Sequence, residues 1–201
     1  LRRGDPRIII PSLVQETDAD HVVWSRRYMP WQIDIDSEIK ASLKEQDIQV
    51  SSINSSLLFE PWQIETKSGG PYRVFTPYWK TVQSRDDIPQ SCSRVDKLKA
   101  PDTLPDTDVI EDWNLLPNSP DWSEGFGPLW NPGEKGARAR LREWLDEDAA
   151  EYDDLRNRPD LNRTSRLSPH LHFGEVSPVT VWHMVQQHIS DGDIPEDQGK
   201  S

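Results

Sequence analysis

The chain has 201 residues, of which 34% are hydrophobic and 29% are charged, and its nine tryptophans offer large surfaces for packing a globular core. Its formal net charge of -12 excludes attraction of the whole surface to nucleic acid or to an anionic membrane, so any nucleic-acid contact requires a local basic patch. A single cysteine, Cys92, excludes an internal disulfide, and no apolar run approaches the roughly 20 residues of a membrane span, so we expect a cytoplasmic protein that associates with no membrane.

The first 59 residues alternate between helical and strand patterns. Apolar residues recur at helical spacing in residues 6–15, where Pro11 is expected to break the helix, and again in residues 36–46. Residues 21–24 and 48–53 are short and rich in β-branched side chains, a pattern typical of buried parallel strands. The order helix, strand, helix, strand predicts part of a doubly wound α/β domain with a parallel sheet over residues 1–59, without its first strands.

Residues 60–132 carry ten prolines between short aromatic groups. A structureless loop of this length is unusual inside a compact domain, so we interpret it as a long interdomain connector that wraps around its neighbours. Five aromatic side chains are expected to dock it by simple packing: Trp62, Tyr72, Phe75, Tyr78 and Trp79.

A helix is predicted from near Gly133. Its apolar residues recur at spacings of three, four and seven, which places them on one face. They are Ala137, Leu141, Trp144, Leu145 and Tyr152. Further along, Ser177 followed by Pro178 predicts the N-cap of another helix.

Residues 164–178 read TSRLSPHLHFGEVSP, and we name residues 164–168 the hydroxyl turn. Ser168 before Pro169 predicts the N-cap of a short helix that Gly174 would close. Free amides at a helix start, beside the hydroxyls of Thr164 and Ser165 and the charge of Arg166, can hold an anion such as a phosphate or a diphosphate. Two ordinary capping serines that need no ligand would give the same pattern.

Two further features of this region are open to ordinary explanations. His170 and His172 are two residues apart with no third ligand nearby, so we favour packing over a metal site. Between residues 154 and 168, four arginines face two aspartates, an excess of two positive charges. This basic island could hold a phosphate backbone, and a solvated loop is the alternative.

The stretch TSRLSPHLHFGEVSP closely resembles the flavin-binding segment of the photolyase/cryptochrome family, particularly the class I cyclobutane-pyrimidine-dimer photolyases. Three more segments follow in the family's order: Arg26, Arg27 and Tyr28; PYRVFTPYWK at 71–80; and WNPGEKGARARLREWL at 130–145, which leads to Tyr152. The resemblance covers residues 1–188. It implies a central fragment in which part of the α/β domain is joined by the wrapped connector to the start of an all-helical FAD-binding domain.

The resemblance also implies roles for individual residues. Tyr152 would contact FAD, and its phosphates would be held by Thr164, Ser165, Arg166, Leu167 and Ser168. Arg156 matches a family position that touches DNA. Asn157 and Arg163 depart from the family's pattern, and Arg163 would either crowd the hydroxyl turn or add a phosphate contact. We expect no metal in this chain. We also expect no catalytic residue, because the family's dimer-facing and electron-transfer residues come after Ser201.

The implied reaction is light-driven repair of pyrimidine dimers in DNA by electron transfer from reduced FAD to a flipped-out dimer. The expected partner is damaged DNA, and the expected antenna chromophore is methenyltetrahydrofolate or a deazaflavin. We expect a monomer, and the fragment alone would be inactive. One alternative is a cryptochrome-like flavin photosensor that signals without repair, and another is a degenerate scaffold without cofactor.

Overall fold

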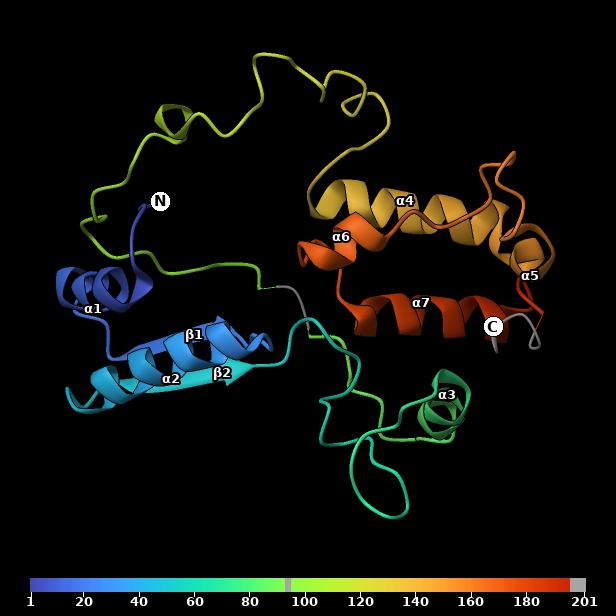
Figure 1. Ribbon diagram of the computed structural model, residues 1–201, viewed down its shortest axis with the longest axis horizontal. Helices are drawn as coiled ribbons and strands as arrows, with labels where there is room; N and C mark the ends of the chain where they lie inside the picture. The colour runs from blue at the N-terminus through green and yellow to red at the C-terminus, as the bar shows by residue number, and fades with distance from the viewer. Residues whose placement is uncertain (93–94, 196–201) are drawn as a thin grey trace. The chain divides into compact units, whose positions relative to one another are not determined.

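The computed structural model describes residues 1–92 and 95–195. One unit consists of Leu1–Asn54 and a later segment that ends at Gly125. The second unit consists of a segment that begins at Ser55 and the part of the chain that begins at Phe126. The first unit contains a small parallel sheet with helices, and the second is helical (Figure 1). An α/β part followed by helices agrees with the predicted order. Residues 196–201, the end of the predicted helical domain, lie outside the described residues.

The first unit is built on two parallel strands, β1 (His21–Ser25) and β2 (Gln49–Ile53). Their register pairs His21 with Gln49 at one end and Ser25 with Ile53 at the other. Helices α1 (Pro6–Thr17) and α2 (Pro30–Lys44) supply the buried core residues. These are Val14, Ile39 and Leu43, which pack with Val22, Trp24 and Val50 of the strands.

The expected break of the first helix at Pro11 is wrong, because Pro11 lies inside α1. A proline removes one helical hydrogen bond, but both ends of this helix are held by other contacts. The Asp5 side chain accepts a hydrogen bond of 2.9 Å from the Arg7 N–H at the start. Val14 is buried against α2 near the end. Tertiary packing therefore outweighs the local penalty.

The two strands are less buried than predicted. Exposed and half-buried residues alternate along β1, and Val23 and Ile53 are 51% and 54% exposed. The prediction of fully buried strands is wrong, because the packed residues Val22, Trp24 and Val50 lie on one face of the sheet. Helix α2 also begins earlier than residue 36, with Pro30 in its first turn, where a missing N–H has no effect on helical hydrogen bonds.

Residues 60–132 are not structureless. They include α3 (Phe75–Gln83) and the 3-10 helix η1 (Ile110–Trp113). Helix α3 forms because Tyr78, Trp79 and Val82 recur at helical spacing and pack with Phe59 and Ile64. Trp79 also contacts Trp182 edge to face, with ring centroids 5.8 Å apart. Of the five predicted aromatic anchors, Tyr72, Tyr78 and Trp79 pack against this cluster. Trp62 and Phe75 are largely exposed, and Phe75 stacks on Trp79 with ring centroids 6.1 Å apart.

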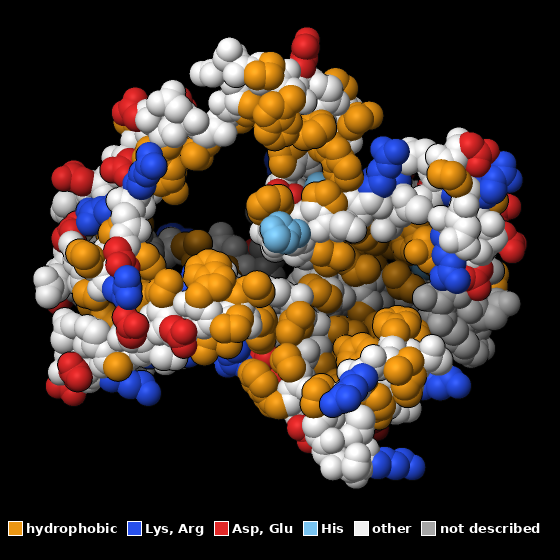
Figure 2. Space-filling view, in the orientation of Figure 1, with side chains coloured by type: hydrophobic (Ala, Val, Ile, Leu, Met, Phe, Trp, Pro, Cys, Tyr) orange, Lys and Arg blue, Asp and Glu red, His pale blue; other side chains and the backbone are white. Residues whose placement is uncertain are grey.

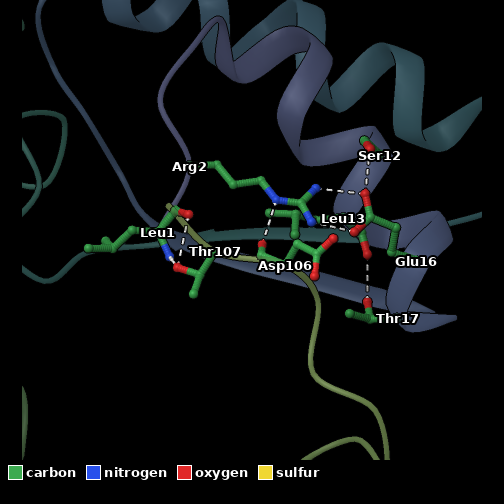
Figure 3. A network of polar contacts seen from close by, with 8 residues as sticks. All are labelled: Leu1, Arg2, Ser12, Leu13, Glu16, Thr17, Asp106 and Thr107. Carbon is green, nitrogen blue, oxygen red and sulfur yellow. Dashed lines mark hydrogen bonds and ion pairs between the residues drawn. The ribbon is translucent and has the colours of Figure 1, made fainter. Parts of the chain in front are cut away.

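A polar network closes the first unit on itself (Figure 3). The Arg2 guanidinium pairs with Glu16 of α1, and its Nε donates to the Asp106 carbonyl at 3.0 Å. Ser12 Oγ donates to the Glu16 carboxylate at 2.7 Å. The Asp108 N–H donates to the Leu1 carbonyl at 2.7 Å. Residues 106–108 are thereby fastened to the start of the chain.

The second unit carries the remaining helical elements. They are α4 (Glu134–Glu147), η2 (Ala149–Glu151), α5 (Tyr152–Leu155), α6 (Ser168–His172) and α7 (Pro178–Asp191). The predicted face of α4 is confirmed for Ala137, Leu141 and Leu145, which are buried, whereas Tyr152 lies past the end of α4, in α5. They pack with Leu167, Val176 and Met184, which joins α4 to α6 and α7. Among the helices of residues 1–92 and 95–195, none is long and apolar enough to cross a bilayer.

The caps around α6 and α7 follow the sequence only in part. Ser177 caps α7 as predicted, because its Oγ accepts from the Thr180 N–H at 3.1 Å. Gly174, with φ of 70°, closes α6 as predicted. Ser168 is not the N-cap of α6, because the backbone of Leu167 is already helical, with φ of -82° and ψ of -9°. Ser168 therefore lies in the first turn.

Candidate functional site

The hydroxyl turn connects α5 to α6 and is held from two sides. On one side, Arg140 of α4 donates from Nε to the Ser165 carbonyl at 3.0 Å and from Nη2 to the Thr164 carbonyl at 2.8 Å. On the other side, the Leu167 side chain is only 4% exposed and packs in the core of the second unit. The backbone between these two anchors has little freedom to move.

The backbone N–H groups and the hydroxyls of the hydroxyl turn have no hydrogen-bond partner among the described residues. Among the described residues, no protein group accepts a hydrogen bond from the backbone N–H of any residue from Thr164 to Ser168. Within the same part of the chain, the hydroxyls of Thr164, Ser165 and Ser168 also have no partner. A diphosphate is bound by several N–H and O–H donors together with a cation, so these residues fit the phosphates of FAD.

Arg166 supplies the cation of the hydroxyl turn. Its φ of 53° lies in the left-handed region, which is unfavourable for a side chain of this size. It lines a hollow of about 370 Å³ together with Trp130, Arg140 and Asn162. Within residues 1–92 and 95–195, no carboxylate pairs with Arg166. Its charge is therefore available to an anion.

The other arginines of the basic island are neutralised locally. Their ion pairs join Arg156 to Asp153 at 3.2 Å, Arg158 to Asp160 at 2.7 Å and Arg163 to Asp148 at 2.6 Å. On the face shown in Figure 2, Lys and Arg side chains stand among Asp and Glu side chains and do not gather in one patch. The island is therefore weaker as an electrostatic surface than its net charge indicates.

Tyr152 and Arg156, predicted to contact FAD and DNA respectively, lie side by side. The Arg156 guanidinium lies over the Tyr152 ring at 5.7 Å from its centroid. Tyr152 also forms an edge-to-face pair with Trp144, with the ring centroids 5.6 Å apart and an angle of 89° between the ring planes. The indole N–H of Trp144 is buried and, among the described residues, has no hydrogen-bond partner. Within that same part of the chain, no hydrogen bond or ring contact joins Tyr152 to the hydroxyl turn.

Arg163 is held by an ion pair within the second unit. Its Nη1 is bound to the Asp148 carboxylate, which is buried. The hydrogen bond and the charge of Asp148 raise the pKa of the Arg163 guanidinium above its ordinary value. The side chain is thus engaged with Asp148, the C-cap residue of α4, and the two roles expected for Arg163 at the hydroxyl turn stay predictions.

His170 packs as predicted. It is 4% exposed, its Nδ1 lies 2.5 Å from the Glu175 carboxylate, and its ring contacts Trp130 edge to face. The hydrogen bond from His170, with a second from the Gly133 backbone, lowers the pKa of Glu175. His172 is exposed and contacts Phe173. No group of three or more His, Cys, Asp or Glu side chains gathers as a metal site in the described part of the chain.

Sequence reasoning missed Arg140. The two carbonyls that it binds, those of Thr164 and Ser165, belong to residues 24 and 25 positions later in the chain. On α4 it is one of several arginines in the run ARARLRE, and nothing in this run distinguishes it from Arg138 or Arg142. Only the packing of α4 against the hydroxyl turn identifies it.

Comparison with known proteins decides the family. A family model described as DNA photolyase matches residues 1–101. The chain belongs to the DNA photolyase family. The deoxyribodipyrimidine photo-lyase of Agrobacterium fabrum is 40% identical over 96% of this chain, and the aligned part makes up 41% of that relative. The chain thus spans about two fifths of the length of the curated relative.

Two other matches bear on class and on the cryptochrome alternative. A crystal structure of a bacterial class III photolyase from Agrobacterium tumefaciens superposes with a TM-score of 0.92 and 38% identity, covering 98% of this chain and 40% of that one. Cryptochrome-1 of Arabidopsis thaliana is 30% identical over 92% of this chain and 27% of its own length. The resemblance to class I in particular has no counterpart in these matches and stays a prediction.

Proposed function

We propose that this member of the DNA photolyase family takes part in light-driven repair of pyrimidine dimers in DNA and supplies one wall of an FAD site. The observation that carries the proposal is the hydroxyl turn, whose N–H and O–H donors are open among the described residues. The name of the relative that is 40% identical, a deoxyribodipyrimidine photo-lyase, supports the same activity. Light-driven electron donation to the dimer is the chemistry that reduced FAD supplies when bound.

Each residue of the site has a distinct part in this proposal. Thr164, Ser165 and Ser168 donate to the phosphate oxygens through hydroxyls and amides, and Arg166 balances their charge. Leu167 fixes the turn in the core. Tyr152 contacts the flavin cofactor, and Arg156 contacts the DNA backbone beside it. No catalytic residue of this chain is proposed.

Several expectations accompany the proposal. The domains are residues 1–59, 60–132 and 133–201, the first being part of a doubly wound sheet. The antenna is methenyltetrahydrofolate or a deazaflavin, and the protein is a cytoplasmic monomer. For the class, the 38% identity to a class III photolyase favours class III over the class I form that the motif resembles.

Light-dependent dimer reversal tests the proposal. The full-length gene product, purified and reduced, is mixed with an oligonucleotide that contains one thymine dimer, and the dimer is quantified after blue light and after darkness. We expect loss of the dimer only in the illuminated sample that contains protein. Equal dimer content in light and darkness, in a preparation that binds FAD, would contradict repair.

A cryptochrome-like photosensor is the second candidate, favoured by the 30% identity to Cryptochrome-1 of Arabidopsis thaliana. The two candidates share the flavin site and differ in the substrate. A protein that binds FAD and changes its absorbance in blue light, while leaving the dimer intact, would identify the sensor.

A further inference from the structure

Each of the three guanidinium nitrogens of Arg140, on α4, has a partner. Nε donates to the Ser165 carbonyl at 3.0 Å, Nη2 donates to the Thr164 carbonyl at 2.8 Å, and Nη1 pairs with Glu143 at 3.1 Å. Its side chain is only 17% exposed. A planar guanidinium that binds two consecutive carbonyls fixes the orientation of both peptide groups.

These two peptide groups carry donors of the hydroxyl turn. Among the described residues, the only cis peptide bond joins Ser119 to Pro120, so the two peptides are trans. In a trans peptide, the C=O and the following N–H point in opposite directions. With the carbonyls of Thr164 and Ser165 directed at Arg140, the N–H groups of Ser165 and Arg166 must point away from it.

Arg140 is unsuited to binding the anion itself. Glu143 pairs with its Nη1, and its Nε and Nη2 each donate to a backbone carbonyl, so all three nitrogens are already engaged. Arg166, in contrast, has no carboxylate partner in the described part of the chain. Arg166 therefore supplies positive charge, and Arg140 sets the direction of the backbone N–H donors.

We propose that Arg140 is a positioning residue, which holds the Thr164 and Ser165 carbonyls so that the N–H groups of Ser165 and Arg166 face the diphosphate of FAD. This inference rests on the proposed flavin site and adds a residue to it. It predicts that loss of the Arg140 guanidinium weakens the hold on the phosphates specifically and leaves the flavin ring's own contacts in place.

The test compares two ligands in the full-length gene product. Affinities for FAD and for riboflavin, which has the same ring system but no phosphate, are measured by fluorescence titration of the apoprotein. The variants are Arg140→Met, Arg140→Lys, and two controls on the same helix, Arg138→Met and Arg142→Met, whose exposed side chains have no ion-pair partner among the described residues. Thermal unfolding of each apoprotein is recorded alongside.

For Arg140→Met we expect FAD affinity to fall on the order of tenfold, the loss expected when hydrogen bonds to a charged group are misaligned, with riboflavin affinity changed less than about twofold. Arg140→Lys should fall between Arg140→Met and wild type, because an ammonium can bind one carbonyl well but cannot span both. The controls should match wild type for both ligands.

Other outcomes separate the two claims. A wild-type apoprotein that binds no FAD would remove the flavin site and this inference with it. Wild-type binding with unchanged FAD affinity in Arg140→Met would overturn the positioning role alone, as would equal losses for FAD and riboflavin. If Arg140→Met does not fold, Arg140→Lys decides: the inference then requires a selective loss of FAD affinity and fails without one.

Discussion

Arg156, the residue proposed to contact DNA, also contacts Tyr152, the residue proposed to contact FAD. Its guanidinium lies over the ring of Tyr152, and it pairs with Asp153 at 3.2 Å while remaining 40% exposed. An exposed pair of this kind is weak, so a DNA phosphate can compete for the guanidinium. The same side chain could then leave Asp153 for DNA without unfolding α5.

Replacing Arg156 by Ala should therefore weaken the binding of dimer-containing DNA to the full-length gene product. Losing one phosphate contact should also reduce the salt dependence of binding, by about one unit in the slope of log K against log salt. Binding curves at several salt concentrations measure both. Arg158→Ala, which removes a nearby arginine paired with Asp160, is the control. An unchanged slope in Arg156→Ala would show that Arg156 only packs on Tyr152.

Helix α4 depends on a close approach between Gly136, in its first turn, and the backbone of Asn131. A Cβ added at Gly136 would lie 1.7 Å from the backbone oxygen of Asn131, and Gly136 is buried. Helix propensity alone would favour alanine by about 1 kcal/mol at this position. The backbone collision is the larger effect, because Asn131 can relieve it only by moving the segment that leads into α4.

Gly136→Ala should destabilise the protein by about 3 kcal/mol, the cost of overpacking a filled site. Urea unfolding of the full-length gene product measures this difference in free energy. Gly127→Ala is the matched control, because nothing lies within 4 Å of a Cβ there, and it should stay within about 1 kcal/mol of wild type. A stabilised Gly136→Ala variant would mean that propensity, and not the contact with Asn131, dominates.

The elements show what could be predicted from sequence. Periodicity identified β1, β2 and the buried face of α4, because these patterns are local. Local rules failed where prolines signalled a break: Pro11 stays within α1, and α3 forms in a proline-rich segment, where its apolar face packs with Phe59 and Ile64. Local rules set a helix's preference, but burial of one side chain can reverse it.

The candidate site divides in the same way. Residues 164–168 are contiguous, so a motif can identify them. Arg140, Asp148 and Glu175 act through partners that are 25, 15 and 5 residues away, and their roles depend on which surfaces meet after folding. The charge of the basic island was predictable as a sum, but its neutralisation by Asp153 and Asp148 required the structure.

The first unit is closed by contacts between residues that are distant in sequence. Arg2 and Ser12 bind Glu16, and Arg2 also holds the carbonyl of Asp106 (Figure 3). The hydrogen bond from Arg2, followed by that from Ser12, lowers the pKa of Glu16 to about 2. A carboxylate with a lowered pKa stabilises the folded state only while it is ionised.

Glu16→Gln should therefore destabilise the protein in a pH-dependent way. The contribution of Glu16 is fully present above its ordinary pKa of 4.5 and disappears as the pH falls toward about 2, so the stability difference between wild type and variant should shrink over that window. Chemical unfolding at a series of pH values measures it. Glu45→Gln, at an exposed carboxylate with no ion-pair partner in the described residues, is the control. A difference that is constant with pH would contradict the proposed contribution of Glu16.

The flavin site at the hydroxyl turn is the claim on which the proposed function depends, and FAD affinity tests it most directly. The full-length gene product is compared with the double variant Thr164→Val/Ser165→Ala and with the control Thr76→Val/Ser190→Ala, whose hydroxyls are exposed on α3 and α7. Hydrogen bonds to a charged phosphate contribute about 1.5–3 kcal/mol each, so the double variant should bind FAD at least about tenfold more weakly, while the control binds as wild type does. Equal affinity in all three proteins would contradict the assignment of residues 164–168 to the phosphates of FAD.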